Sequence, residues 1–362
     1  MSAELPCYKP PSRETRACWN GRDDGDDSDV QRWHQAISFI DLSKPLDYFF
    51  EPTICFIGYA SDLGVRENLG RAGAAEGPAR LRVRMASFPV VQGVALADCG
   101  DIVAGATVLE TQEALATVVE QIVRSGALPV ILGGGHDQAF GHFLGVARAR
   151  GTPPACINFD AHLDLRPIPA GGPNSGTPFT QVWEWCKSRN APFRYTALGV
   201  QRNGNTAQLF TRAEQAGATL VDADGFALDT LDIVMEAIND AVDEAEICLS
   251  VDLDVFAAGF APGVSAPTAM GIGPDAAFRR IFRGLMASGR VRGVEIAELC
   301  PALDVDDRTA RLGAAVAFEV ALGVLDAVND DDSDDDDSDD ADGEGGDSGG
   351  EILGDGPSGD DA

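Results

Sequence analysis

The sequence predicts an α/β domain built around a mostly parallel sheet. From Thr53 onward, short apolar runs alternate with longer stretches of helical periodicity, a pattern typical of a parallel sheet covered by helices. The apolar runs are nearly continuous, as strands buried on both faces require. Polar segments follow several of these runs, at the strand ends where α/β folds place their ligands.

Strands and helices are expected in alternation through the central region. The six expected strands are Ile54–Gly58, Leu128–Leu132, Ala155–Phe159, Tyr195–Val200, Ile247–Val251 and Val291–Ile296. The expected helices include Pro78–Met85, Glu110–Ser125, Asp229–Ala241, Pro274–Ala287 and Thr309–Val328. No internal repeat is visible, so residues 51–328 are interpreted as one domain.

The two ends of the chain differ from this domain. Residues 1–50 are expected to form a partly flexible arm with little core, interrupted by the acidic patch Asp23–Asp29. From Asp330 onward there are sixteen acidic residues and no basic one. Such a segment cannot bury enough apolar surface to offset the entropy of ordering, so residues 329–362 are expected to be a disordered acidic tail.

The charge of the chain limits its partners. The formal net charge is −31, and 24 of the 27 basic residues are arginine. An acidic, lysine-poor surface indicates a halophilic source, because counterions in a salty cytoplasm screen the self-repulsion. For the tail, a binding arm for a basic partner is the alternative. No basic patch stands out, which argues against nucleic-acid binding.

Neither a membrane nor a secretory segment is expected. No segment reaches the roughly 18 apolar residues of a membrane span, and Met1–Pro11 lacks the apolar region of a secretory signal. The eight cysteines include no Cys-x-x-Cys pair, and Cys55, Cys156 and Cys248 lie in apolar strand-like runs. Reduced, buried thiols in a cytoplasmic protein are therefore expected.

Three short segments after expected strands carry the residues of a metal site. They are Gly133–Asp137 (Gly-Gly-Gly-His-Asp), Asp160–Asp164 (Asp-Ala-His-Leu-Asp) and Ser250–Asp254 (Ser-Val-Asp-Leu-Asp). Their potential ligands are two imidazoles and four carboxylates, at His136, Asp160, His162, Asp164, Asp252 and Asp254. Alternate residues of an extended chain point to the same side, which groups these ligands. Mixed nitrogen and oxygen ligands favour Mn²⁺, and four carboxylates are enough for a bridged pair of ions.

Each segment alone also has a simpler interpretation. The three glycines are equally compatible with a plain turn, and Asp-x-Asp at a strand end is often a helix cap or a solvated turn. The distribution of histidine favours the joint interpretation, because the chain has four histidines and two of them lie in these segments. Of the others, His142 is expected on a helix surface or in the core, and His34 has no expected role.

The three segments resemble the metal-binding signatures of the ureohydrolases, the family of arginases, agmatinases and formimidoylglutamases. Gly64–Pro78 is similar to the opening block of that family, and Glu298–Pro301 (Glu-Leu-Cys-Pro) to its closing Glu-x-x-Pro signature, so the resemblance covers roughly residues 53–327. It implies a three-layer αβα arginase-like fold, with residues 51–328 as the catalytic domain. It also implies a closed homo-oligomer, for which a trimer or a hexamer is expected.

The same resemblance implies two Mn²⁺ ions per subunit. One ion would be held by His136, Asp160, Asp164 and Asp252, and the other by Asp160, His162, Asp252 and Asp254, so that Asp160 and Asp252 bridge. Glu298 would receive the cationic amidine end of a substrate, and Asp164 would take and return a proton. Asp137 has two open interpretations: it orients an imidazole or a water from behind the ligands, or it caps the following helix.

One loop separates the members of the family. An ungapped comparison places Phe179 where arginases carry a proton-shuttling histidine, and Ser175 where agmatinases carry a histidine. No histidine follows His162 in the chain, so a shifted alignment does not supply one. The loop Asn174–Phe179 resembles that of the formimidoylglutamases instead, as does Gly199–Thr206.

Arginine side chains are suited to a substrate with carboxylates. Arg166 lies two residues after Asp164, where its guanidinium would pair with a substrate carboxylate through two hydrogen bonds. Arg71, Ser175 and Arg202 are the other expected substrate contacts, and a surface ion pair is the alternative for each arginine. Agmatine has no carboxylate and would be repelled by these side chains.

The leading interpretation is a binuclear-manganese formimidoylglutamase that makes L-glutamate and formamide in histidine degradation. The alternatives are another ureohydrolase, such as a guanidinobutyrase, guanidinopropionase, agmatinase or arginase, and a non-catalytic member of the fold that binds metabolites. The intact set of six ligands argues against a non-catalytic member. A small-molecule substrate is expected, without nucleic-acid or membrane partners.

Overall fold

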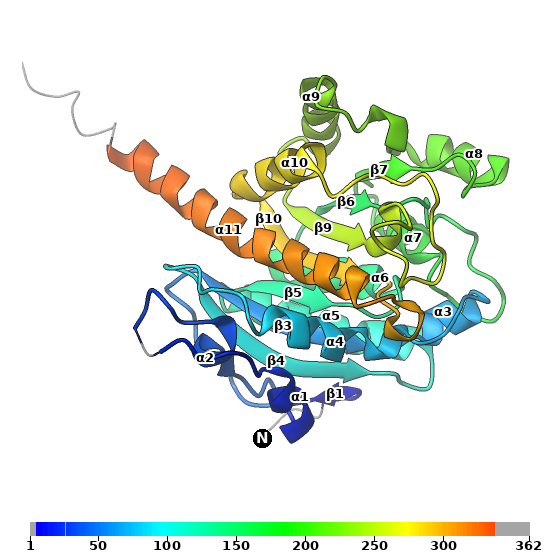
Figure 1. The fold of residues 1–362 in the computed structure, drawn as a ribbon. Coiled ribbons are helices and arrows are strands. Elements are labelled where there is room, and N and C mark those ends of the chain that lie inside the picture. The colour runs from blue at the N-terminus through cyan, green and yellow to red at the C-terminus, as the bar shows by residue number, and fades with distance from the viewer. Residues whose placement is uncertain (1–4, 26, 337–362) are drawn as a thin grey trace, which may run out of the picture.

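The central sheet is mostly parallel, as predicted. A computed structural model describes residues 5–25 and 27–336. Within this part of the chain, ten strands form one sheet in the order β1-β4-β3-β5-β10-β9-β6-β7-β8, with β2 beside β4. Every pair is parallel except β1 with β4. Helices lie on both faces of the sheet (Figure 1), which gives three layers.

The bounds of the elements are as follows. The strands are β1 (Tyr8–Lys9), β2 (Ser38–Phe39), β3 (Thr53–Ala60), β4 (Ala95–Val103), β5 (Leu128–Leu132), β6 (Ala155–Phe159), β7 (Tyr195–Val200), β8 (Thr219–Asp222), β9 (Ile247–Asp252) and β10 (Val291–Ala297). The α-helices are α1 (Arg13–Cys18), α2 (Trp33–Ala36), α3 (Leu63–Glu67), α4 (Gly77–Met85), α5 (Val108–Arg124), α6 (Gln138–Arg150), α7 (Pro178–Ser188), α8 (Ala207–Ala216), α9 (Leu231–Val242), α10 (Ala276–Ala287) and α11 (Arg308–Asp336).

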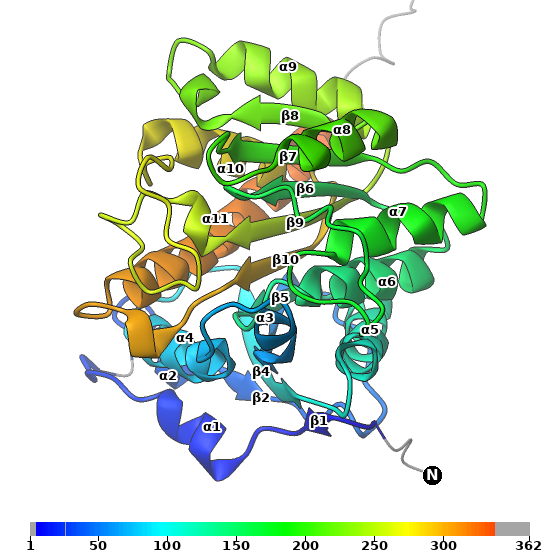
Figure 2. The same ribbon diagram turned by 90° about the vertical axis from the view of Figure 1, so that its right-hand side faces the viewer.

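The two faces of the sheet have separate cores. Alternate residues of β3 show the division: Ile54 and Phe56 belong to the cluster that includes residues of α4, α9, α10 and α11, whereas Cys55 and Ile57 belong to the cluster that includes residues of α5 and α6. A third cluster joins α6, α7 and α8 to β6 and β7. Figure 2 shows α5, α6 and α7 together on one side of the sheet. Burial on both faces explains why the strand runs are almost continuously apolar.

The predicted strands are confirmed, and β5, β6 and β7 have the predicted bounds. The sequence did not predict β4, because Asp98 and Asp101 interrupt its apolar pattern. The structure offsets the charge of Asp98 with the buried guanidinium of Arg82, whose Nε lies 2.7 Å from Asp98 Oδ2. A long-range ion pair therefore permits a strand that local composition disfavours.

The N-terminal region contributes to the core, so the expectation of little core in residues 1–50 is wrong for residues 5–25 and 27–50. Trp33 is fully buried and packs on Phe56 and Phe88. Trp19 Nε1 donates to Asp98 Oδ2 at 2.6 Å, and Tyr8 OH donates to the carbonyl oxygen of Cys99 at 2.8 Å. Widely spaced aromatic anchors hold this region on the sheet, and such anchors produce no local periodicity.

The C-terminal helix is longer than predicted. α11 continues to Asp336, so residues 329–336 of the expected tail are helical, and residues 337–362 lie outside the described residues. Within the described residues, Arg308–Asn329 is long and apolar enough to cross a membrane by length and composition alone, a candidate that the sequence analysis did not identify. In this structure its residues Ala310, Ala314 and Ala317 are buried in the core, as in a helix of a globular domain.

Candidate metal centre and substrate pocket

The candidate ligands meet because their strands are neighbours. In the sheet, β5, β10, β9 and β6 lie side by side. Their carboxyl ends lead to His136, Glu298, Asp252 and Asp160, respectively. The sequence separates these residues by up to 162 positions, and the parallel sheet returns each strand end to the same edge.

The turn before His136 requires glycine at position 134. A Cβ on Gly134 would lie 2.0 Å from the carbonyl oxygen of Tyr59, so no other residue fits there. The carbonyl oxygen of Gly134 accepts from the backbone N–H of Glu298 at 2.8 Å, and Glu298 Oε1 accepts from the backbone N–H of His136 at 2.9 Å. The plain-turn interpretation and the functional one are therefore compatible, because this turn joins the His136 and Glu298 strand ends.

Two of the site residues have an unusual backbone. Asp164 has φ of 46° and Glu298 has φ of 66°. Left-handed conformations are uncommon for residues with a Cβ and persist only where the surroundings enforce them. Here they direct two carboxylates into one pocket.

Three carboxylates surround one nitrogen of His136. Its Nδ1 lies 2.9 Å from Asp164 Oδ2, 3.1 Å from Asp252 Oδ2 and 3.2 Å from Asp160 Oδ2. His136 is 1% exposed and Asp160 is fully buried. This first cluster therefore offers one nitrogen with three carboxylate oxygens within 3.2 Å of it.

A second cluster shares Asp160 with the first. His162 Nδ1 lies 3.2 Å from Asp254 Oδ2 and 3.5 Å from Asp160 Oδ1. The ligand atoms of Asp160, His162 and Asp254 lie within 4.8 Å of one another, as do those of His136, Asp160 and Asp164. The structure thus brings five of the six predicted ligands into two groups with Asp160 in common, and places the sixth, Asp252, 3.1 Å from His136 Nδ1.

The residues of both clusters fit divalent cations. His136 Nδ1 and Asp254 Oδ1 are buried and have no hydrogen-bond partner among the described residues. Burial, and then the neighbouring Asp160 carboxylate, raises the pKa of Asp164 to about 6. Burial, and then Asp252, raises the pKa of Asp254 well above its usual range. Crowded carboxylates of this kind require nearby positive charge, and nitrogen and oxygen donors suit Mn²⁺.

Asp137 does not cap the helix that follows it, so the capping interpretation is wrong. It stands at the N-cap of α6, but its side chain accepts no capping hydrogen bond. Instead Asp137 Oδ2 accepts from Tyr59 OH at 2.5 Å. Burial raises the pKa of Asp137 to about 7. Its carboxylate is thus bound to Tyr59 of β3, and no described contact joins it to a ligand imidazole.

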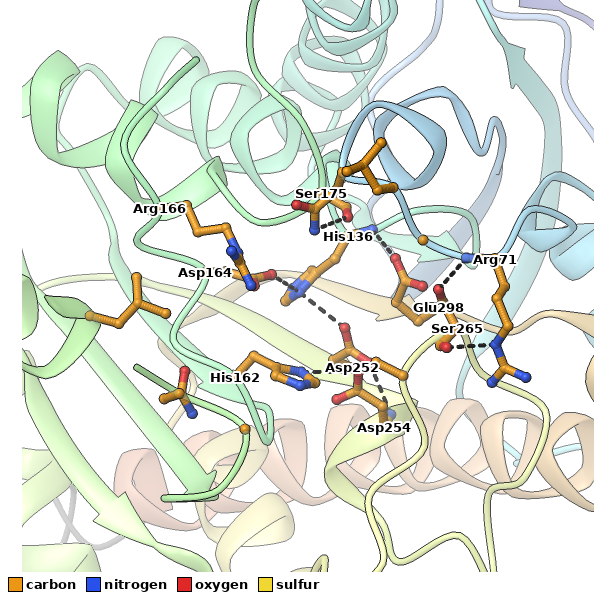
Figure 3. A pocket seen from close by; sticks show the side chains of 17 residues that line it. Arg71, His136, His162, Asp164, Arg166, Ser175, Asp252, Asp254, Ser265 and Glu298 are labelled. Atoms are coloured by element: carbon orange, nitrogen blue, oxygen red, sulfur yellow. Dashed lines mark hydrogen bonds and ion pairs between the residues drawn. The ribbon is translucent and has the colours of Figure 1, made fainter. Parts of the chain in front are cut away.

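A cavity of about 390 Å³ opens above the clusters. Figure 3 shows His136, His162 and the carboxylates between Arg166 on one side and Arg71 on the other. Asp164, Arg166, Ser175, Arg71 and Glu298 all line it, as predicted for ligand or substrate contacts. Ser175 Oγ is held by Asn68 Nδ2 at 3.1 Å.

The two rim arginines are held differently. Arg71 Nε donates to the carbonyl oxygen of Ser265 at 2.8 Å, and its Nη2 donates to that of Val264 at 2.7 Å. Among the described residues, the Arg166 side chain has no ion-pair partner, and its methylene groups pass beside Gly176. Arg166 is therefore available for an anionic ligand.

Arg202 does not lie on this pocket. Its guanidinium pairs with Asp222 Oδ2 at 2.9 Å, and its side chain is 80% exposed. The structure therefore supports the surface-ion-pair alternative for Arg202. The sequence prediction rested on the position of Arg202 in Gly199–Thr206, a segment that resembles the family. The direction of its side chain depends on Asp222 of β8, a strand that the sequence did not predict.

Several lining residues were missed by sequence reasoning. They are Asn68, Leu69, Gly70, Gly204, Asn205, Leu209, Ser265 and Ala266. Asn68 lies in Gly64–Pro78 and Asn205 in Gly199–Thr206, two segments that resemble the family, which was the available signal, whereas Ser265 had none. Phe179, at the position of the arginase histidine, does not line the cavity and stacks on Tyr195 with ring centroids 4.2 Å apart.

Comparisons with known proteins agree with this geometry. The model of the arginase family matches residues 52–323. Formimidoylglutamase of Ralstonia nicotianae is 40% identical over 315 residues, which cover 84% of this chain and 95% of that protein. Formimidoylglutamase of Clostridium tetani is 37% identical over 325 residues, covering 86% and 95%, respectively.

Solved structures show the same fold. Trypanosoma cruzi formiminoglutamase with Mn²⁺ superposes with a TM-score of 0.65 at 26% identity, covering 75% of this chain and 93% of that one. Formimidoylglutamase of Bacillus subtilis gives a TM-score of 0.70 at 24% identity, covering 83% and 95%. The predicted three-layer arginase-like fold is confirmed.

Proposed function

The chain belongs to the arginase family, and on that premise we propose that it hydrolyses N-formimidoyl-L-glutamate to L-glutamate and formamide. One observation carries the proposal: two carboxylate–imidazole clusters that share Asp160 lie beneath a pocket with a guanidinium on each side. The curated relatives named above are formimidoylglutamases, at 37% and 40% identity over most of the chain. Histidine degradation is the pathway proposed from that name.

We propose two Mn²⁺ ions per subunit, with the ligands predicted from the sequence. The support is the donor set and the Mn²⁺ named for the Trypanosoma cruzi structure. His136, Asp164 and the shared Asp160 would hold one ion, and His162, Asp254 and Asp160 the other. Asp252, 3.1 Å from His136 Nδ1, would be the second bridging residue. When bound, the paired ions supply a water of lowered pKa at neutral pH.

The side chains of the pocket would complete the reaction. Glu298 would accept hydrogen bonds from the formimino nitrogen and orient the carbon that is attacked. Asp164 would take the proton of the attacking water and return it to the departing glutamate nitrogen. The C–N bond to that nitrogen breaks and the new C–O bond becomes the formamide carbonyl. The second proton of the water passes to the formimino nitrogen, which becomes the NH₂ group of formamide, so that one water is consumed.

The rim arginines would select the substrate. N-Formimidoyl-L-glutamate carries two carboxylates, and Arg166 and Arg71 flank the cluster from opposite sides (Figure 3). We propose that Arg166 binds one carboxylate directly, because its guanidinium has no ion-pair partner among the described residues. Arg71 already donates to two backbone carbonyls, so it would contribute a positive field to the other carboxylate with its remaining N–H groups.

A substrate panel in the presence of Mn²⁺ tests the proposal. We expect the highest kcat/KM for N-formimidoyl-L-glutamate, with lower values for arginine, agmatine and guanidinobutyrate, which lack the pair of carboxylates. Assays at high and low KCl are run in parallel, since the acidic composition supports our proposal of a halophilic source. A preference for agmatine or arginine would refute the substrate assignment, and no hydrolysis of any amidine would favour the non-catalytic alternative.

Replacing Arg166 with alanine should raise KM for formimidoylglutamate. A hydrogen bond to a charged group contributes about 1.5–3 kcal/mol, which corresponds to a roughly ten- to hundredfold rise. Arg166→Lys should recover only part of the loss, because an ammonium cannot reproduce the planar fork. Steady-state kinetics measure both changes, and metal content should stay at the wild-type value.

Arg202→Ala is the matched control for Arg166. It also removes one arginine from a family-like loop, but its partner is Asp222 and it lies outside the pocket. We expect its KM to remain near the wild-type value. Equal effects of the two substitutions, or a wild-type KM in Arg166→Ala, would refute the carboxylate-binding role.

We further propose a closed homo-oligomer, a trimer or a hexamer, in the cytoplasm. The resemblance to the family supports the oligomer, and the sequence pattern supports the location. Residues 51–328 are proposed to be the catalytic domain, and residues 329–362 an appended acidic segment. Sedimentation velocity at high salt measures the number of subunits.

A further inference from the structure

A buried carboxylate lies behind the ligand His136, on the side opposite the Asp cluster. His136 Nε2 is 2.9 Å from Ser250 Oγ and 3.9 Å from Glu295 Oε1. Ser250 on β9 and Glu295 on β10 are register partners in the sheet, which fixes their positions relative to each other. The side chains of His136 and Glu295 are each 1% exposed, so no bulk solvent competes for these contacts.

The two ring nitrogens of His136 therefore have different surroundings. Nδ1 points at the three carboxylate oxygens that would share a metal ion with it. A neutral imidazole has one N–H and one lone pair, and a nitrogen that ligates a metal must offer the lone pair. The Ser250 hydroxyl can donate or accept, so it selects neither form. The Glu295 carboxylate attracts a proton to Nε2 and so favours the lone pair on Nδ1.

A second histidine lies on the far side of Glu295. His142 Nδ1 is 3.7 Å from Glu295 Oε2, and His142 is 1% exposed. A Cβ on Gly293 of β10 would lie 2.3 Å from His142 Nε2, so the strand needs glycine there to admit the ring. Glu295 is thus enclosed between two imidazoles, and no arginine or lysine pairs with it among the described residues.

This arrangement is costly for the stability of the fold. Glu295 Oε2 and His142 Nε2 have no hydrogen-bond partner among the described residues. A buried carboxylate without full pairing destabilises a protein, and an apolar or neutral replacement is often tolerated or stabilising. Packing alone therefore does not explain Glu295.

We infer that Glu295 is a positioning residue for the metal ligand His136, and that His142 holds Glu295 in place from behind. The inference rests on the proposed assignment of His136 as a ligand. It extends that assignment to three residues that do not line the pocket, Glu295, Ser250 and His142.

The test is a titration of the metal-free protein with Mn²⁺ alone. Calorimetry and electron paramagnetic resonance monitor the binding. Glu295→Gln keeps the volume of the side chain and removes the charge. We expect the Mn²⁺ affinity of Glu295→Gln at the His136 site to fall about 10–100-fold, the usual effect of losing a residue that orients a metal-binding histidine. At a Mn²⁺ concentration that fills both sites of the wild type, the variant should show an uncoupled single-ion spectrum instead of a spin-coupled pair.

Thermal unfolding of the metal-free proteins separates positioning from a general structural role. Removing a buried charge should leave the Tm of Glu295→Gln unchanged or raise it, while Mn²⁺ affinity falls. A merely structural residue would instead lower both. His142→Asn should weaken the same site less than Glu295→Gln, because His142 acts through Glu295.

Cys248→Ala is the matched control. Cys248 is a buried residue of β9 two positions before Ser250, on the same side of the strand, and it makes no described contact with a candidate ligand. We expect wild-type Mn²⁺ affinity in Cys248→Ala, and a loss at the His136 site in Ser250→Ala.

Histidine-specific ¹⁵N NMR of the Zn²⁺-loaded protein reports the tautomer directly, since the chain has four histidines. In the wild type, His136 should carry its proton on Nε2, and in Glu295→Gln this signal should lose population or shift. An unchanged His136 signal together with unchanged Mn²⁺ affinity would overturn the inference.

The outcomes also separate this inference from the proposed function. If the wild type binds paired Mn²⁺ without hydrolysing formimidoylglutamate, the substrate assignment fails and the role of Glu295 stands. If the wild type binds a pair and Glu295→Gln binds it equally well, only the role of Glu295 fails. If the wild type binds no Mn²⁺ at His136, both fail.

Discussion

Replacing Asp160 with alanine is expected to abolish hydrolysis and the pairing of metal ions. Asp160 is the residue common to both clusters, with Oδ2 3.2 Å from His136 Nδ1 and Oδ1 3.5 Å from His162 Nδ1. Its removal leaves neither site complete. The charge stabilisation that paired ions give a transition state is several kcal/mol, so kcat should fall by about 10³-fold or more. Metal analysis after dialysis and steady-state kinetics measure the two effects.

Asp254→Ala provides the comparison. Asp254 belongs to the His162 cluster and not to the cluster of His136, Asp160 and Asp164. This variant should therefore retain close to one Mn²⁺ per subunit, whereas Asp160→Ala retains less. Full activity in an Asp160→Ala protein that carries no Mn²⁺ would contradict the two-metal mechanism altogether.

Replacing Arg82 with alanine is expected to cause the largest loss of stability. Its side chain is 2% exposed and pairs with Asp98 at 2.7 Å and with Asp101 at 2.6 Å. Asp98 is itself fully buried. Breaking a buried pair leaves an uncompensated charge, which costs about 3–5 kcal/mol. Urea unfolding at constant salt, Mn²⁺ and protein concentration measures the change in the free energy of unfolding.

Arg80→Ala is the control on the same helix. Arg80 pairs with Asp307 from a side chain that is 40% exposed, and Arg84 contacts the same carboxylate. Exposed pairs contribute about 0–1 kcal/mol, so this variant should unfold close to the wild type. If both substitutions cost the same, the Asp98 pair is not what permits β4 to carry acidic residues inside the sheet.

The candidate ligands were predictable because their signals are local. Each lies two residues from another ligand or within four residues of the end of an apolar strand, so a segment of five residues carries the information. The substrate contacts were less predictable. Arg71 and Arg202 both lie in segments that resemble the family, but Arg71 lines the pocket and Arg202 pairs with Asp222. No local pattern distinguishes these two outcomes, because each side chain is held by residues outside its own segment: Arg71 by Val264 and Ser265, and Arg202 by Asp222.

The sequence by itself determined the positions of six of the ten described strands, the parallel sheet and the six candidate metal ligands, because apolar runs and strand-end polar residues are properties of short segments. Only the tertiary structure decided which of the candidate metal ligands lie close together. The sheet order β5-β10-β9-β6 brings the ends of four distant strands together, and it places Glu295 and Ser250 behind His136. It also decided that residues 5–25 and 27–50 contribute to the core, through side chains such as Trp19 and Trp33. Such contacts join residues far apart in the chain, and their free energy comes from burial and pairing that no local window contains.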